Sequence, residues 1–320
     1  MLSPQTDRPV VHPARLGLVG CGRLAEVGYV PASRAAAGVD IVAVSDPDRA
    51  RRGLLAAKLG ASAHARLGEL LGAYRLDGIV ICTGTEQHEE VAAEVAAAGF
   101  SALVEQPPAP EHRGALRLMM LTPAPWIAFN RRFDHGAELA GRIPPGIELE
   151  LRMVLHERRR SWRPVARAED ALLDLAPHLI DLALHLTGMV PLAVRAHAAP
   201  DRAGIELAAT RARVRIECAT DRPPLELVEV LDGGGRRIAR AERAGRARGV
   251  AARVLPGVHP IVRSLTAQLE AYGRALRGED PGPLATAAEA AAVMCVVDAA
   301  RRSDAIGGET VAVEGVTLAS

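Results

Sequence analysis

The segment from Arg15 to Ala37 constrains the fold of this chain more than any other part of the sequence. A short apolar run ends in Gly20-Cys21-Gly22-Arg23-Leu24-Ala25, and the residues that follow favour helices. Strand, tight turn and helix are therefore expected in direct succession. The first glycine permits the turn, the second lets backbone N–H groups approach a phosphate, and Ala25 lets the helix lie close to the strand. This arrangement predicts a Rossmann-type unit that binds a dinucleotide.

The residues after this unit repeat the alternation of strand and helix. Buried strands are expected at 39–44, 78–82 and 101–104, and helices at 48–59 and 86–98. Strands that alternate with helices of this length form parallel sheets covered on both faces. We therefore predict that residues 1–128 form an α/β Rossmann domain with a doubly wound parallel sheet, which binds the dinucleotide.

The pattern changes after about residue 129. Residues 148–154 and 211–217 alternate apolar with charged side chains, as antiparallel strands with one solvated face do. Apolar residues recur at helical spacing over 169–186, and the alanine-rich chain from 260 to 302 is also expected to be helical. Residues 129–320 are therefore predicted to form an α+β domain with an open, mainly antiparallel sheet, for substrate binding and oligomerisation. Its C-terminal helices are expected to pack back on the Rossmann domain.

Composition narrows the class of partner. The chain carries 39 basic and 38 acidic residues, a net charge of +1, so it lacks the positive field that nucleic acid or an anionic membrane requires. No run approaches the roughly 18 uncharged apolar residues of a membrane span. The four cysteines lie far apart without the spacing of a zinc site, so no metal is expected. These features predict a cytoplasmic protein whose partner is a small molecule.

Asp46 ends the second predicted strand, where a carboxylate can accept hydrogen bonds from the ribose hydroxyls of the adenosine. The cofactor is therefore NAD or NADP, and Asp46 favours NAD because a 2′-phosphate would meet its negative charge. Arg49, Arg51 and Arg52 follow closely and offer the alternative of a phosphate contact, although a solvated first turn of a helix also accounts for them.

Several motifs occur together along the chain. In order, they are Gly20-Cys21-Gly22-Arg23-Leu24-Ala25-Glu26, Asp46-Pro47-Asp48, Thr83-Gly84-Thr85-Glu86-Gln87-His88, Val104-Glu105-Gln106-Pro107 and Leu172-Leu173-Asp174-Leu175-Ala176-Pro177-His178-Leu179-Ile180-Asp181. This set resembles the Gfo/Idh/MocA oxidoreductases, which pair an N-terminal Rossmann domain with a C-terminal α/β domain built on an open sheet. The resemblance covers nearly the whole chain.

The resemblance implies roles for individual residues. Those expected along the cofactor are Gly20, Gly22, Arg23, Leu24, Ala25, Asp46, Thr83, Gly84, His88 and Glu105. Asp174 and His178 correspond to the family's catalytic pair. Residues four apart on a helix share one face, so the Asp174 carboxylate can orient the His178 imidazole. The alternative is that Asp174 only caps or pairs locally and that His178 is a satisfied core residue.

Gln106 departs from the family pattern, because it stands where the Glu-Lys-Pro motif has its lysine. Lys58 is the single lysine of the chain and lies too early in the sequence to replace it. An amide carries no positive charge, but its N–H can still hold a hydroxyl or polarise a carbonyl. Proton transfer is therefore assigned to His178. Asn130, Trp162 and Arg163 are expected to join Gln106 and His178 in contacting substrate, with a structural role at the domain junction as the alternative for Asn130.

These predictions describe an NAD(P)-dependent oxidoreductase that transfers hydride to or from a hydroxyl, carbonyl or imine carbon of a sugar, cyclitol or amino-sugar. The missing lysine supports a second hypothesis, an NAD(P)-binding regulator, sensor or partner subunit without turnover. A third is elimination or epimerisation in which the cofactor is recycled in place. The open sheet is expected to pair copies of the chain as a homodimer or homotetramer, because exposed apolar sheet surface is costly.

Overall fold

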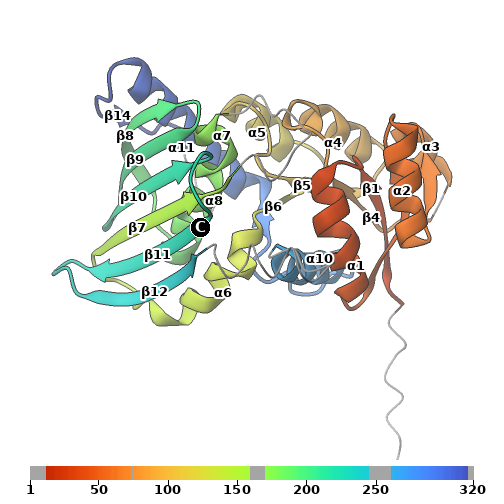
Figure 1. The fold of residues 1–320 in the computed structure, drawn as a ribbon, viewed down its shortest axis with the longest axis horizontal. Helices are drawn as coiled ribbons and strands as arrows, with labels where there is room; N and C mark the ends of the chain where they lie inside the picture. The colour runs from red at the N-terminus through yellow and green to blue at the C-terminus, as the bar shows by residue number, and fades with distance from the viewer. Residues whose placement is uncertain (1–11, 74, 159–169, 245–260, 316–320) are drawn as a thin grey trace, which may run out of the picture.

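A computed structural model describes residues 12–73, 75–158, 170–244 and 261–315. The chain forms two units side by side, each built on one seven-stranded sheet (Figure 1). Trp162 and Arg163 lie outside the described residues. Within those ranges, no helix combines the length and apolar character that a bilayer crossing needs.

The first sheet has the strand order β13-β6-β5-β4-β1-β2-β3. Its strands are β1 (Ala14–Val19), β2 (Val39–Ser45), β3 (Ser62–His64), β4 (Gly78–Ile81), β5 (Ser101–Glu105), β6 (Trp126–Ala128) and β13 (Ala285–Thr286). Strands β1 to β6 pair in parallel, and only β13 is antiparallel to its neighbour. The predicted doubly wound sheet is confirmed.

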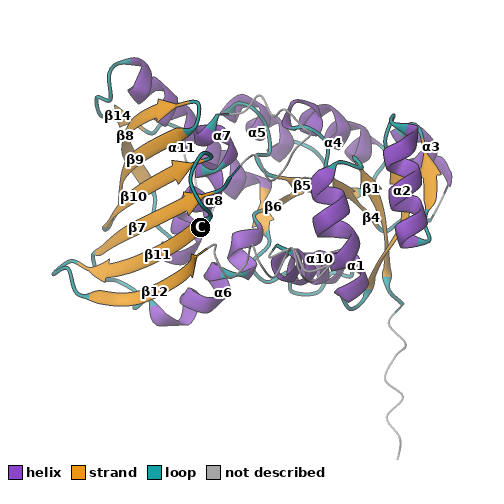
Figure 2. Cartoon of the chain, in the orientation of Figure 1, coloured by secondary structure: helices purple, strands orange, loops and turns teal. Residues whose placement is uncertain are grey.

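Helices cover both faces of this sheet (Figure 2). They are α1 (Val30–Ala35), α2 (Arg49–Leu59), α3 (Leu67–Ala73), α4 (His88–Ala97) and α5 (His112–Met119), and α10 (Val262–Leu276) from late in the chain packs beside α1. Successive residues of β4 belong to opposite cores, Ile79 and Ile81 to one and Val80 to the other. This two-residue period is the reason that a nearly continuous apolar run predicts a strand buried on both sides.

The second sheet has the order β12-β11-β7-β10-β9-β8-β14. Its strands are β7 (Leu149–His156), β8 (Pro191–Ala199), β9 (Arg202–Ala209), β10 (Ala212–Ala219), β11 (Leu225–Asp232), β12 (Arg237–Ala244) and β14 (Val311–Ala312). Only β7 and β10 pair in parallel, so the sheet is mainly antiparallel, as predicted. The helices α6 (His135–Leu139), α7 (Ala171–Asp174), α8 (Ala176–Thr187) and α11 (Ala287–Ala305) lie on one side of it, and the other face is open (Figure 1).

Two predicted helices are each divided in the structure. The segment expected to be one helix over 169–186 forms α7 and α8, which meet at Leu175. Pro177 explains the break, because it has no N–H to donate to Leu173 and its ring would crowd that carbonyl inside a continuous helix. The segment 260–302 likewise divides into α10 and α11, and the residues between them include Pro281, Gly282 and Pro283.

The C-terminal part of the chain returns to the first unit. Strand β13 extends the Rossmann sheet beside β6, and α10 packs against α1 and the turn before it. The packing is close, because a Cβ on Gly28 would lie 2.6 Å from the Leu265 side chain. Contacts between residues far apart in the sequence therefore hold the first unit together.

Candidate active site

The glycine loop after β1 has the geometry of a phosphate cradle. Gly20 has a φ of +92°, and a Cβ there would lie 2.4 Å from the Cys82 carbonyl oxygen, so only glycine fits beside β4. A Cβ on Gly22 would meet nothing within 4 Å, so the backbone there faces open space. Helical backbone begins at Arg23, and Ala25 is fully buried against the core. Free N–H groups at such a helix start can bind the pyrophosphate of a dinucleotide.

Asp46 closes the adenosine end of this cradle. Its carboxylate accepts the N–H of Cys21 at 2.7 Å and the N–H of Asp48 at 2.8 Å, which fixes it at the carboxyl end of β2. Arg52 donates to the Pro47 carbonyl at 2.9 Å, and Arg51 pairs with Asp48 at 3.4 Å. Two of the three nearby arginines therefore already have partners, which favours the interpretation that they belong to the surface of α2.

The two glycines provide a matched pair of variants. Gly20→Ala should lower the free energy of unfolding by more than about 2 kcal/mol, because the new methyl group meets backbone in a left-handed conformation. Gly22→Ala should leave stability unchanged. It should raise the Kd for NADH about tenfold to a hundredfold, which corresponds to the loss of one hydrogen bond to a charged group. Thermal unfolding and NADH fluorescence titration measure both. A Gly22→Ala variant that binds NADH normally would show that this loop is not the phosphate site.

The loop after β4 carries the next predicted cofactor residues. Thr83 is half-buried and Gly84 is exposed, whereas His88 is 1% exposed. The His88 ring nitrogens lie 2.9 Å from the Pro107 carbonyl oxygen and 3.2 Å from that of Thr83. His88 therefore lies beneath the loop and ties it to the segment after β5. The expectation that His88 lies along the cofactor stays a prediction.

Glu105 ends β5 and Gln106 follows it, and both are buried, at 7% and 8% exposure. One Glu105 oxygen accepts the Tyr29 hydroxyl at 2.6 Å, and the other accepts the Gln106 N–H at 3.1 Å. The Gln106 Oε1 has no hydrogen-bond partner within the described ranges. Because a buried acceptor without a donor is costly, this oxygen is a natural contact for a ligand N–H or O–H.

The structure places two of the predicted site residues, Gln106 and Asn130, close together. Glu105 pairs in register with Ala128 of β6, so Gln106 lies beside the start of the turn that carries Asn130. Asn130 is 5% exposed and donates to the Ser264 hydroxyl of α10 at 3.1 Å, which supports the junction role left open for it.

Asp174 and His178 belong to the second unit, on α7 and α8. Burial raises the pKa of the Cys218 thiol on β10, Arg131 lowers it, and Asp174 raises it, so both charged groups lie near that thiol. Asp174 is 8% exposed at the end of α7, and His178 is half-buried in the first turn of α8. Their four-residue spacing crosses the break at Leu175, so helix periodicity alone does not make them share a face.

The remaining predicted cofactor residues line the helix start. Arg23 is exposed and pairs with Glu26 at 3.1 Å, and Leu24 is half-buried beside Gly28. Lys58 pairs with Glu26 at 2.7 Å on the Rossmann unit, which confirms that it does not replace the missing lysine beside Pro107.

Sequence patterns did not identify three residues that organise this region: Tyr29, Arg131 and Gln268. Arg131 is 7% exposed and donates to Glu226 at 2.9 Å and to Glu157 at 3.3 Å. The signal available for it was its place in the sequence beside Asn130. Tyr29 and Gln268 carry no local signal, because their partners lie far away in the chain.

One cluster among the described residues has metal-ligating side chains. Ligand atoms of Asp134, His135 and Glu226 lie within 4.8 Å of one another. Arg243 pairs with Asp134, and Arg131 pairs with Glu226. The guanidinium groups therefore already supply the positive charge that a cation would bring, and the cluster serves as an ion-pair network between η3 (Asn130–Phe133), α6 and the sheet edge.

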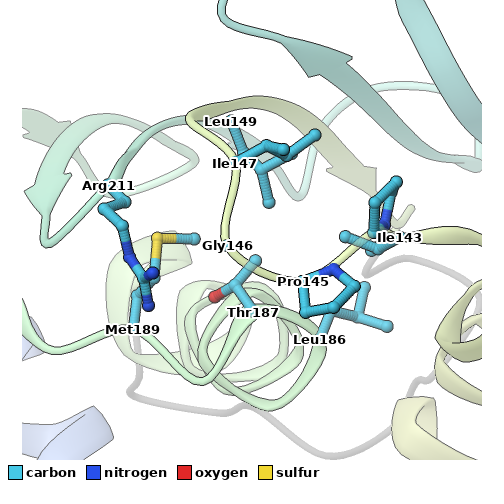
Figure 3. Close-up of a pocket in the computed structure, with 10 residues that line it drawn as sticks. Ile143, Pro145, Gly146, Ile147, Leu149, Leu186, Thr187, Met189 and Arg211 are labelled. Carbon is cyan, nitrogen blue, oxygen red and sulfur yellow. The ribbon is translucent and has the colours of Figure 1, made fainter.

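A separate cavity of about 150 Å³ lies in the second unit, and Figure 3 shows the residues that line it. Its walls are apolar apart from Thr187 and Arg211, and they come from the loop before β7 and the end of α8. None of the predicted site residues lines it. We take the region of the glycine loop, Gln106 and Asn130, together with Asp174 and His178, as the candidate active site.

Comparison with known proteins agrees with this architecture. Residues 14–122 match a family model described as an oxidoreductase family with an NAD-binding Rossmann fold. Inositol 2-dehydrogenase 2 of Saccharopolyspora erythraea is 29% identical over 198 residues, which cover 59% of this chain and 58% of that protein. The chain thus matches little more than half the length of this relative.

Two solved structures share the fold over nearly the full chain. Myo-inositol dehydrogenase from Lactobacillus casei, in complex with NAD(H) and myo-inositol, has a TM-score of 0.76 at 16% identity and covers 96% of this chain and 99% of its own. The WlbA dehydrogenase from Bordetella pertussis, in complex with NADH and UDP-GlcNAcA, has a TM-score of 0.77 at 20% identity, with 98% and 100% covered.

Proposed function

We propose that this chain is an NAD-dependent dehydrogenase of the Gfo/Idh/MocA oxidoreductase family, whose model of the NAD-binding Rossmann fold matches residues 14–122. The observation that carries this proposal is the cradle of Gly20, Gly22 and Asp46, which meets the steric and hydrogen-bonding needs of a dinucleotide. The Gln106 Oε1, a buried acceptor at the domain junction, adds a contact for the reacting end of a ligand.

The cofactor, when bound, exchanges hydride with the substrate carbon, and the residues of this chain supply positioning and proton transfer. His178 takes the proton of the substrate hydroxyl as hydride leaves, or returns it when a carbonyl is reduced. The Asp174 carboxylate orients the imidazole and stabilises its protonated form. Gln106 holds the substrate oxygen through its amide N–H.

The substrate class we propose is a cyclitol or sugar, with oxidation at a ring hydroxyl. Inositol 2-dehydrogenases are among the relatives, and one structural neighbour was crystallised with myo-inositol. The polar residues of the junction suit a ligand that is rich in hydroxyl groups, since each buried acceptor or donor there needs a partner.

Binding of NADH and NADPH tests the cofactor side of this proposal. NADH should bind at least about tenfold more tightly, because a 2′-phosphate would lie beside the Asp46 carboxylate. Asp46→Asn should bring the Kd values for NADH and NADPH closer together. Arg52→Ala should leave their ratio unchanged, since Arg52 donates to backbone carbonyls. Fluorescence titration measures each Kd. Tighter NADPH binding that is lost in Arg52→Ala would instead assign Arg52 to a phosphate.

We also propose a cytoplasmic homodimer or homotetramer formed through the open face of the second sheet. That face carries charged side chains, with Arg215 lying 3.5 Å from Glu150 and 3.7 Å from Glu206. Ion pairs, rather than the exposed apolar residues first expected, would therefore make the contact. Sedimentation of wild type and Arg215→Glu tests this assembly. The variant is expected to dissociate into monomers, and a monomeric wild type would contradict the proposal.

A further inference from the structure

A chain of buried polar groups connects the late helix α10 to the end of β5. The Gln268 side-chain N–H donates to the Tyr29 hydroxyl at 3.3 Å, and that hydroxyl donates to Glu105 at 2.6 Å. The second Glu105 oxygen accepts the Gln106 N–H at 3.1 Å. Tyr29 and Gln268 are completely buried, and Glu105 and Gln106 nearly so. Water cannot replace a lost partner at such depth without reorganisation.

The local backbone explains why Tyr29 reaches Glu105. Residues Ala25–Tyr29 form a π-helical turn between the glycine loop and α1, and such turns are frequent at functional sites. Gly28 lies directly against Leu265, which holds the turn against α10. Tyr29 is thereby fixed on the same helical segment that begins at the phosphate cradle.

The direction of the hydrogen bond follows from the environment of the phenol. Burial raises the pKa of Tyr29 well above its usual value, and the adjacent Glu105 carboxylate raises it further. The hydroxyl therefore keeps its proton and donates to the carboxylate. A donated hydrogen bond to a buried carboxylate is stronger than one between neutral groups, so it restricts where Glu105 can point.

We propose that Tyr29 is a positioning residue for Gln106, acting through the Glu105 carboxylate. The hydroxyl fixes one oxygen of Glu105, and the other oxygen then holds the backbone N–H of Gln106, whose side chain faces substrate in the proposed function on which this inference rests. Gln268 completes the chain by holding the Tyr29 hydroxyl from α10. The orientation of Gln106 thus depends on a helix from late in the sequence.

Tyr272 is a matched control on the same structural unit. It is also completely buried, donates to the Ser101 carbonyl at 2.8 Å, and accepts the Ile79 N–H at 3.2 Å. Its contacts lie at the opposite end of β5 from Glu105. Tyr272→Phe and Tyr29→Phe therefore remove equivalent hydroxyl groups, but only the second acts on Gln106.

The glutamine content of the chain makes the test direct. It has four glutamines, Gln5, Gln87, Gln106 and Gln268, so labelling with 15N-glutamine yields few NMR signals. Gln106→Lys and Gln268→Met each remove one set of signals and thereby assign them. Exposed Gln87 serves as an internal reference. The spectra need neither cofactor nor substrate, so this test is independent of whether the proposed dehydrogenase activity exists.

Tyr29→Phe should shift the backbone amide signal of Gln106 clearly more than that of Gln87, while Tyr272→Phe should leave the Gln106 signal in place. Gln268→Met should shift the same Gln106 signal and serves as the second variant if Tyr29→Phe does not fold. Where turnover is measurable, Tyr29→Phe should lower kcat more than it raises KM for the substrate. An unmoved Gln106 signal in a folded Tyr29→Phe or Gln268→Met protein would overturn the proposal and leave Tyr29 a structural residue.

Discussion

Replacing His178 with alanine is expected to lower kcat by about 10²–10⁴-fold, the usual contribution of a positioned general acid or base. The reason is that Gln106 cannot exchange a proton, so the substrate hydroxyl depends on the imidazole in the first turn of α8. Initial rates of NADH formation with myo-inositol and related polyols measure the effect. NADH affinity should change little, because the phosphate cradle is on the other unit.

His185→Ala is the matched control for this variant. His185 lies on the same helix, and burial lowers its pKa to about 4, so it is neutral at an assay pH near 7. His185→Ala should affect stability but leave kcat within about twofold of wild type. The variant loses packing surface on the same helix, but it keeps the His178 imidazole that carries the proton. Equal losses of kcat in both variants would assign the effect of His178→Ala to helix packing.

The largest stability effect is expected at the buried ion pair between Arg132 and Asp181. Arg132 is 3% exposed and binds both Asp181 oxygens, at 2.6 Å and 2.9 Å, while Asp181 is completely buried. Arg132→Met should lower the free energy of unfolding by about 3–5 kcal/mol, because it leaves a buried carboxylate without its partner. Urea denaturation followed by circular dichroism measures this change.

The exposed pair of Arg202 and Asp221 gives the comparison. The Arg202 guanidinium also reaches both oxygens of its carboxylate, but the two side chains are 58% and 38% exposed. Arg202→Met should therefore cost less than about 1 kcal/mol. If both variants lose the same stability, burial is not what makes the Arg132 contact important.

The sequence was informative wherever function depends on local geometry. Gly20, Gly22 and Asp46 could be predicted because a tight turn, an open backbone and a carboxylate at a strand end follow from neighbouring residues. The two sheets were predictable for a similar reason, since strand periodicity is a property of a few consecutive residues.

Contacts between residues far apart in the sequence could not be predicted from local patterns, for physical reasons. Gln268 lies 239 residues from its partner Tyr29, and no periodicity relates residues so far apart. The burial of His88 depends on carbonyl groups at Thr83 and Pro107, which only the folded loops bring together. The break at Leu175 was foreseeable from Pro177, but the regular leucine spacing around it predicted one continuous helix. The leucine spacing of the segment favoured one helix, whereas Pro177 favoured a break, and the structure has the break.

Turnover of NAD+ with a panel of cyclitols and sugars, compared among wild type, His178→Ala and Gln106→Lys, is the decisive test of the proposed dehydrogenase activity. The wild type is expected to form NADH with at least one polyol, and His178→Ala is expected to lower this rate by about 10²–10⁴-fold. If all three proteins bind NADH but only Gln106→Lys turns substrate over, the natural chain is a cofactor-binding protein without redox turnover, and the dehydrogenase proposal is wrong.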